Sequence, residues 1–162
     1  MARIERFEDI RAWKQARVLA QMVYEISGQG AFARDFGLRD QIREAAGSVM
    51  HNIAEGFDAG SDQEFVRFLR YARRSATEVQ SELYIALDQA YISHGRFQEI
   101  YDQATNVKKL INAFIGYLHS PGDHKLREVP AEYVVNPSDR TDLLDDHPTK
   151  WPNDHPTKWP ND

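Results

Sequence analysis

The position of the prolines divides this chain of 162 residues into two parts. All seven prolines lie at or after Pro121, and none occurs in the first 120 residues. Proline breaks the interior of a helix because it lacks a backbone N–H and its ring clashes with the preceding turn. Long uninterrupted helices are therefore possible only in the first part. We expect a helical domain over residues 1–120 and an extended, proline-rich C-terminal tail over residues 121–162.

Charge and composition narrow the class of protein further. Residues 1–120 hold 15 Lys and Arg against 16 Asp and Glu, whereas residues 121–162 hold 5 against 9, so the tail is acidic. The absence of cysteine excludes disulfides, thiolate metal sites and cysteine nucleophiles. The N-terminus is charged throughout, unlike a secretory signal. No apolar run approaches the roughly 18 residues of a membrane helix. These features predict a cytoplasmic protein without a membrane partner.

Apolar residues recur at helical spacing throughout residues 1–120. In one segment the steps alternate between four and three, which is typical of a helix seam and not of a strand. This segment is predicted to run from Asp62 to about Ser93, and Ser61 with Glu64 forms a capping-box pattern before it. Its seam consists of Phe65, Leu69, Ala72, Ala76, Val79, Leu83, Leu87 and Ala90. Similar spacing predicts helices over about 7–27, 38–53 and 97–118.

The connections between these helices predict their arrangement. They fall over residues 28–37, over residues 56–61 and around Gly95. The last two are short, and short connections favour antiparallel neighbours. The sequence therefore predicts an all-α fold, an up-down-up-down antiparallel four-helix bundle.

A polar motif, Asn52, Glu55 and Gly56, closes the second predicted helix. Asn52 lies on the shoulder of the apolar face, where a half-buried amide is expected to form hydrogen bonds between helices. Gly56, with Gly60, suits a left-handed helix stop. Glu55 then lies near the start of the next helix, where a carboxylate is favourable. We interpret this motif as structural and not catalytic.

Three segments of the sequence resemble a known family. They are "FEDIRAWKQA" (residues 7–16), "FGLRDQIREAAGSVMHNIAEG" (36–56) and "EFVRFLRYARRSATEVQSEL" (64–83). The chain resembles, over about residues 7–118, the bacterial four-helix-bundle proteins encoded by intervening sequences in large-subunit ribosomal RNA genes. That family is related to the accessory variability proteins of diversity-generating retroelements.

The resemblance implies a four-helix bundle, often a homopentameric ring, with no established enzyme activity. In the retroelement relatives it implies a basic surface that binds nucleic acid and a reverse transcriptase. This sequence departs from the pattern in two places. Arg74-Ser75 stands where the third helix usually carries a Gly-Ser pair, and the chain has a net charge of −5 where the retroelement proteins are basic.

The motifs of common enzymes are missing from the sequence. A di-iron centre in a four-helix bundle needs Glu-x-x-His motifs, and none occurs here. The pairs His51/Glu55 and Glu78/Glu82 are spaced by four residues, which alone is a weak metal signal and is typical of a solvated or interfacial face. No glycine-rich phosphate loop and no Gly-x-Ser-x-Gly sequence is present. We predict a protein that is not an enzyme and has no cofactor or metal.

Three arginines of the third predicted helix form a stripe. Arg67, Arg70 and Arg74 are spaced by three and four residues and lie opposite the apolar seam, with Arg73 to one side. One interpretation is a surface that contacts the phosphates of RNA or DNA. A second is an ordinary solvated helix face. A third is pairing with acidic residues of a neighbouring subunit, with Glu64, Glu78 and Glu82 as the candidates.

The first predicted helix is apolar on two sides. One stripe contains Trp13, Ala16, Ala20, Val23 and Tyr24, and the other contains Leu19, Met22 and Ile26. A helix at the corner of a bundle buries one stripe in its own subunit, so the other is expected to meet another subunit. The spacing does not decide which stripe faces inward. We predict a homo-oligomer with Leu19, Met22 and Ile26 as its interface, and the resemblance suggests five subunits.

The tail ends in a tandem octapeptide, HPTKWPND, over residues 147–154 and 155–162. Its prolines and low apolar content argue against a packed core. Trp151 and Trp159 suit a peptide that docks on a protein partner, and residues 132–137 suit a short extended segment. The alternative is a disordered tail. Taken together, the sequence predicts a self-associating scaffold or adaptor, and the alternative is a nucleic-acid-binding accessory protein that partners a reverse transcriptase.

Overall fold

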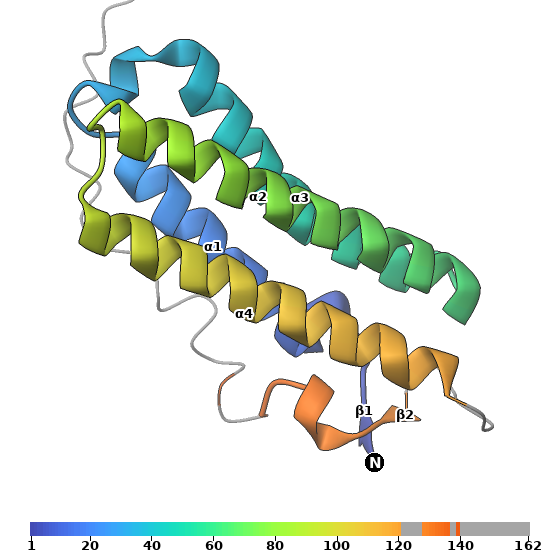
Figure 1. The fold of residues 1–162 in the computed structure, drawn as a ribbon. Coiled ribbons are helices and arrows are strands. Elements are labelled where there is room, and N and C mark those ends of the chain that lie inside the picture. The colour runs from blue at the N-terminus through green and yellow to red at the C-terminus, as the bar shows by residue number, and fades with distance from the viewer. Residues whose placement is uncertain (121–127, 137–138, 140–162) are drawn as a thin grey trace, which may run out of the picture.

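The computed structural model describes residues 1–120, 128–136 and 139, and four long helices form most of it. They are α1 (Arg11–Ser27), α2 (Phe36–Asp58), α3 (Asp62–Asp88) and α4 (His94–His119). Each helix packs along the next one in sequence, and α1 also packs along α4, which closes the bundle (Figure 1). This arrangement confirms the predicted all-α four-helix bundle.

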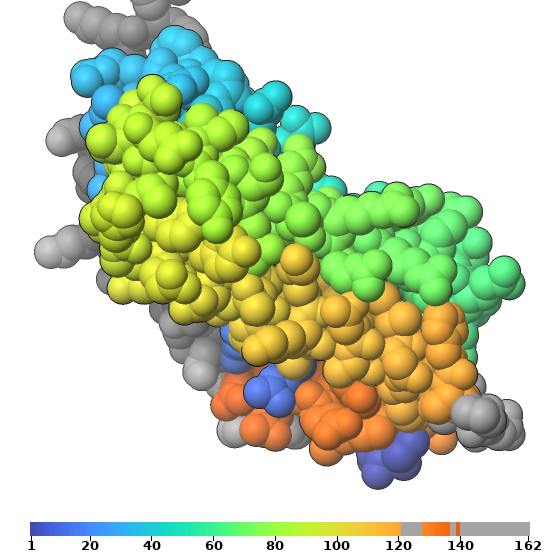
Figure 2. All heavy atoms as spheres, in the orientation of Figure 1, coloured from blue at the N-terminus to red at the C-terminus, as the bar shows by residue number. Residues whose placement is uncertain are grey.

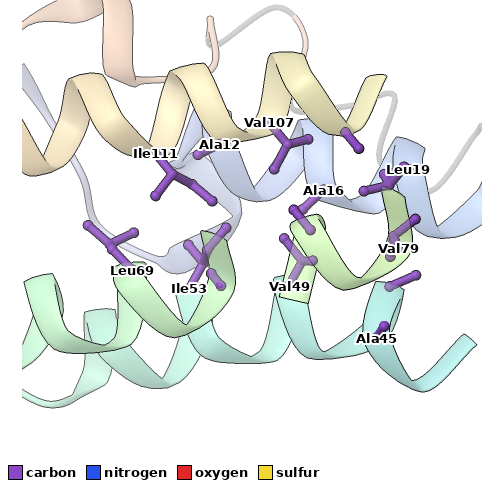
Figure 3. Close-up of a cluster of buried hydrophobic side chains, with 14 of the residues drawn as sticks. Ala12, Ala16, Leu19, Ala45, Val49, Ile53, Leu69, Val79, Val107 and Ile111 are labelled. Carbon is purple, nitrogen blue, oxygen red and sulfur yellow. The ribbon is translucent and has the colours of Figure 1, made fainter. Parts of the chain in front are cut away.

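The apolar faces of the four helices meet in one core. Leu19 of α1, Ile53 of α2, Leu69 of α3 and Ile111 of α4 are all fully buried and converge there (Figure 3). The predicted seam of α3 is buried from Phe65 to Leu83. Burial of these side chains is the main source of stability, at about 25 cal/mol for each Å² of apolar surface removed from water.

Two helix ends differ from the prediction. Helix α3 ends at Asp88 and not near Ser93, because Ala90 adopts a left-handed conformation with φ of 57°. Ser93 instead starts α4, where its Oγ accepts a hydrogen bond from the Arg96 amide at 3.2 Å. Residues 7–27 are not one helix either: a short 3-10 helix, η1 (Phe7–Asp9), precedes α1.

The sequence suggested that α2 ends at Gly56, but this prediction is wrong. The helix continues through Gly56 to Asp58, and Gly56 is buried against α3. A Cβ atom at this position would lie 2.6 Å from Cβ of Phe68 and 2.8 Å from Cδ2 of Phe65. The glycine therefore allows α2 and α3 to approach closely. Gly60, with φ of 81°, forms the predicted left-handed turn before α3.

A C-terminal segment, residues 128–136, packs against the start of the chain. Strand β2 (Glu128–Val129) pairs antiparallel with β1 (Ala2–Arg3), and the backbone amide of Val135 donates to the carbonyl of Asp9 at 2.8 Å. Between them lies a 3-10 helix, η3 (Ala131–Tyr133), whose Tyr133 ring stacks on Phe114 of α4 with centroids 5.0 Å apart. Figure 2 shows this segment beneath α4.

The sequence predicted that this segment belongs to the tail. Its partners, residues 2–10, lie far away in the sequence, so no local pattern indicated the contact. The octapeptide repeat with Trp151 and Trp159 lies outside the described residues. No helix in the described part of the chain is long and apolar enough to span a membrane.

We predict opposite effects for alanine at two glycines of α2. Gly56→Ala should lower the free energy of unfolding by about 1–3 kcal/mol, because the new methyl group overlaps Phe65 and Phe68. Gly47→Ala is the control, since its Cβ would meet only the His51 ring, at an ordinary 3.5 Å. That variant should be neutral or up to about 1 kcal/mol more stable, because alanine favours helix. Urea unfolding measures both changes, and equal effects would contradict the close contact at Gly56.

Candidate interaction surface on helices α2 and α3

The arginine row, which we define as Arg67, Arg70 and Arg74, lies on the outer face of α3. All three side chains are exposed. The guanidinium groups of Arg67 and Arg74 lie 6.0 and 5.9 Å from the ring of Tyr71, which is itself partly exposed. Within the described residues, the one ion pair of the row joins Arg67 to Glu64, at 3.4 Å. The row is therefore a positive surface whose charge is largely uncompensated by the described residues.

Arg73 does not belong to this row. Its side chain is half-buried, and Nη1 donates a hydrogen bond to Oδ1 of Asn112 at 2.8 Å. This bond joins α3 to α4, so the guanidinium group is engaged in packing between helices. The structure thus separates the four arginines proposed from the sequence into three that face outward and one that is structural.

The outer face of α2 carries the opposite charge. Asp40, Glu44, Glu55 and Asp58 are exposed, and their spacing places them within one side of the helix. We call these four residues the acidic face. It is hollowed beside Gly47, where Ser48, His51 and Glu55 line the depression. The sequence-based predictions did not include this face, although the helical spacing of its four residues indicates it.

The nearby arginines of α2 do not neutralise the whole acidic face. Arg39 pairs with Asp40 at 2.8 Å. Arg43 turns toward α1, where it lies 4.6 Å from the centre of the Tyr24 ring and donates to Oγ of Ser27 at 2.7 Å. Within the described residues, Glu44, Glu55 and Asp58 have no ion pair.

A polar contact joins α2 to α3 beside the acidic face, but Asn52 does not form it directly. The hydroxyl groups of Ser48 and Ser75 lie 2.9 Å apart across the two helices. The Asn52 amide instead donates within α2, to the carbonyl oxygen of Ser48 at 2.8 Å and to its Oγ at 3.0 Å. The prediction that the Asn52 amide bridges the helices is therefore wrong: Ser48 and Ser75 form the bridge, and Asn52 contacts it only through Ser48.

Glu82 of α3 is the most unusual ionisable group at the border between α2 and α3. Its side chain is only 6% exposed, and its Oε2 has no hydrogen-bond partner among the described residues. Burial first, and then the negative charges of Glu78 and Glu44, raise the pKa of Glu82 to about 7. The sequence had placed Glu82 on a solvated or interfacial face. The structure shows that it is shielded by its own subunit.

The proposed interface on α1 is wrong for two of its three residues. Leu19 is fully buried and Ile26 is 6% exposed within the single subunit, and Met22 is half-buried. Ala16 and Val23 of the other stripe are buried as well. Helix α1 packs between α2 and α4. Because these two helices together cover more of the surface of α1 than one stripe, residues of both apolar stripes are buried.

In the part of the chain that the structure describes, no group of three or more His, Asp or Glu side chains is placed to hold a metal ion. The distinctive polar groups lie instead on two neighbouring outer faces and at the border between them.

The fold and this surface define a class of protein, a single four-helix bundle with oppositely charged outer faces. The model of the 23S rRNA-intervening sequence protein family matches residues 8–113, so the chain belongs to that family, as the resemblance had indicated. No curated protein matches the chain.

A solved structure is similar to the bundle. It is a protein of unknown function from the S23 ribosomal protein family of Bacteroides thetaiotaomicron, with 22% sequence identity and a TM-score of 0.59. The match covers 64% of this chain and 97% of the other. At this level of identity the similarity shows a shared fold.

We predict that Glu82→Gln stabilises the protein in a pH-dependent way. The folded-state pKa of about 7 exceeds the ordinary value of 4.5, so the folded state holds its proton more tightly. The stability that comes from this proton is complete below pH 4.5 and is lost as the pH rises to about 7. The variant should therefore gain up to about 3 kcal/mol over the wild type at pH 8 and little at pH 4.5.

Urea unfolding at several pH values measures this difference. Glu78→Gln is the matched control, because Glu78 is exposed and acts on Glu82 only through its charge. Its effect should have the same direction and be smaller. An advantage of Glu82→Gln that did not change with pH would show that the carboxyl group has the same pKa in the folded and unfolded states.

Proposed function

We propose that this protein is a non-enzymatic, cytoplasmic scaffold or adaptor that associates with copies of itself. The observation that supports this proposal is the set of large apolar side chains that the described helices leave exposed. Within the described helices, every large exposed apolar side chain lies on α1, α2 or α3, and α4 has none. They are Tyr24, Phe36, Tyr71, Tyr84 and Ile85.

The fold does not need these exposed side chains, since the core is filled by buried residues of all four helices. One flank of α4 is covered by the C-terminal segment 128–136, in which Val129 and Val135 are buried. The same segment contacts α1, where Arg11 donates to the carbonyl of Glu132 at 3.5 Å, but in the described chain it does not pack along α2 or α3. Large apolar side chains that stay exposed without a role in the core are candidates for a contact with another molecule.

A second candidate function is binding of RNA or DNA at the arginine row. The observation that favours it is the combination of three exposed guanidinium groups with the partly exposed ring of Tyr71. Arginine pairs with phosphate through two parallel hydrogen bonds, and an aromatic ring can stack on an unpaired base. The local field, and not the net charge of the chain, governs the approach of a phosphate.

We predict a mass above that of one subunit in solution. Light scattering at micromolar concentration should give a multiple of 18.7 kDa, and the five subunits suggested by the family give about 94 kDa. Ile85→Glu should reduce this mass, because Ile85 is 47% exposed on the outer face of α3. Lys109→Glu, on the exposed side of α4, is the control and should leave the mass unchanged. A wild-type mass of 18.7 kDa would contradict self-association.

The nucleic-acid candidate predicts a salt dependence that the arginine row controls. Binding to random single-stranded RNA should weaken between about 50 and 200 mM salt, with each neutralised phosphate contributing about 0.7 to the logarithmic slope. Replacing Arg67, Arg70 and Arg74 by alanine should flatten this slope. Arg73→Ala is the matched control, because Arg73 lies in the same helix but contacts Asn112. An equal loss in both variants would argue against the row as the binding surface.

A further inference from the structure

We propose that the arginine row of one copy docks on the acidic face of α2 in a second copy. This inference rests on the proposed self-association and names the two surfaces that meet. Its partner is another molecule of this chain, recognised by opposite charge on two exposed helix faces.

The arginine row has few partners among the described residues of its own subunit. Of its three guanidinium groups, only that of Arg67 has an ion pair in the described part of the chain, with Glu64. The other acidic residues suggested by the sequence are poor partners for an approaching arginine, because Glu82 is buried and Glu78 is a single exposed carboxylate next to it. The described chain therefore leaves Arg70 and Arg74 accessible to carboxylates of another molecule.

The acidic face offers these carboxylates in a suitable arrangement. Glu44, Glu55 and Asp58 are exposed and without an ion pair among the described residues. At a rise of 1.5 Å per residue they extend over about 21 Å of helix, and the arginine row extends over about 10 Å. The row thus fits within the length of the face. The hollow beside Gly47 leaves space for a long side chain between Glu44 and Glu55.

Glu82 adds a second observation at the border of α2 and α3, where a buried carboxyl group lies near other carboxylates. Its Oε2 is buried without a hydrogen-bond partner in the described chain, and Glu44 of the acidic face and Glu78 both act on it as like charges. A buried carboxyl group among other carboxylates is unfavourable unless a cation or a proton compensates it. A guanidinium group that binds at Glu44 would reduce this repulsion at the border of α2 and α3.

Both surfaces are present on every copy, on neighbouring helices of the bundle. A contact between two different surfaces of identical chains can repeat from copy to copy, and it forms a closed ring when the rotation closes. The proposed contact therefore uses each subunit twice, once through α3 and once through α2.

A charge-reversal experiment tests this pairing. In the first variant Arg67, Arg70 and Arg74 are replaced by Glu, and in the second Glu44, Glu55 and Asp58 are replaced by Lys. Each variant alone should dissociate to subunits of 18.7 kDa, with self-association weakened about 100-fold or more by like charges. Mixed in equal amounts, they should associate with each other, because the reversed α3 of one meets the reversed α2 of the other. Strict alternation closes only rings with an even number of subunits, so the expected result is mixed species heavier than 18.7 kDa and not the wild-type mass. A chain that carries all six substitutions should regain self-association.

The controls separate this inference from the proposed function. Circular dichroism and thermal unfolding establish that each variant is folded, and Asp102→Lys with Lys109→Glu reverses two exposed charges on α4 without an expected change in mass. If the wild type is a monomer, the proposed self-association is itself wrong. If the wild type associates and both reversed variants keep its mass, self-association stands and the docking of these two faces is overturned.

Two further outcomes also decide the matter. If both reversed variants dissociate but neither the mixture nor the six-substitution chain reassembles, the two faces do not pair with each other and the inference is overturned. If the first variant keeps the wild-type mass and loses only its affinity for single-stranded RNA, the row is a nucleic-acid surface and the docking is again overturned.

Discussion

The close contact of α2 with α3 at Gly56 is the constraint on which the polar features of this bundle depend. The space for a Cβ at this position is filled by Phe65 and Phe68, so the helices approach closely there. The same pair of helices brings the hydroxyl groups of Ser48 and Ser75 to 2.9 Å and shields Glu82 from water. A glycine that the sequence presents as part of a helix end therefore helps to set the geometry of the whole border.

The opposite charges of the two outer faces have a consequence for the border between them. Burial first, and then the negative charges of Glu78 and of Glu44 in α2, act on Glu82, and the arginine row lies at residues 67–74 of α3. Charges of opposite sign thus occur on the outer faces of one pair of helices. Among the described residues, Glu44, Glu55 and Asp58 have no ion pair, although residues 1–120 are nearly neutral in total. Contacts from outside the subunit are a direct way to compensate such a distribution.

The helices were predictable because their cause is local. Spacing by three and four in a proline-free stretch requires only neighbouring residues, and the buried seam from Phe65 to Leu83 follows from it. The features that the sequence did not predict depend on contacts with residues of other helices. The role of Gly56 requires Phe65 and Phe68 of another helix, and the burial of Leu19 and Ile26 depends on how much of α1 its two neighbours cover. The family resemblance indicated the bundle, but no local pattern showed that residues 128–136 return to residues 2–10.

The return of residues 128–136 also explains why the candidate surface lies on α2 and α3. This segment packs Tyr133 on Phe114 of α4 and pairs with β1, and Arg11 of α1 donates to the carbonyl of Glu132 at 3.5 Å. Part of the side formed by α1 and α4 is thus already occupied by the chain itself. Helices α2 and α3 lie on the opposite side, and segment 128–136 does not cover their charged outer faces (Figure 1). Within the described residues, the chain therefore covers part of the α1 and α4 side with its own C-terminal segment and leaves the charged residues of α2 and α3 exposed.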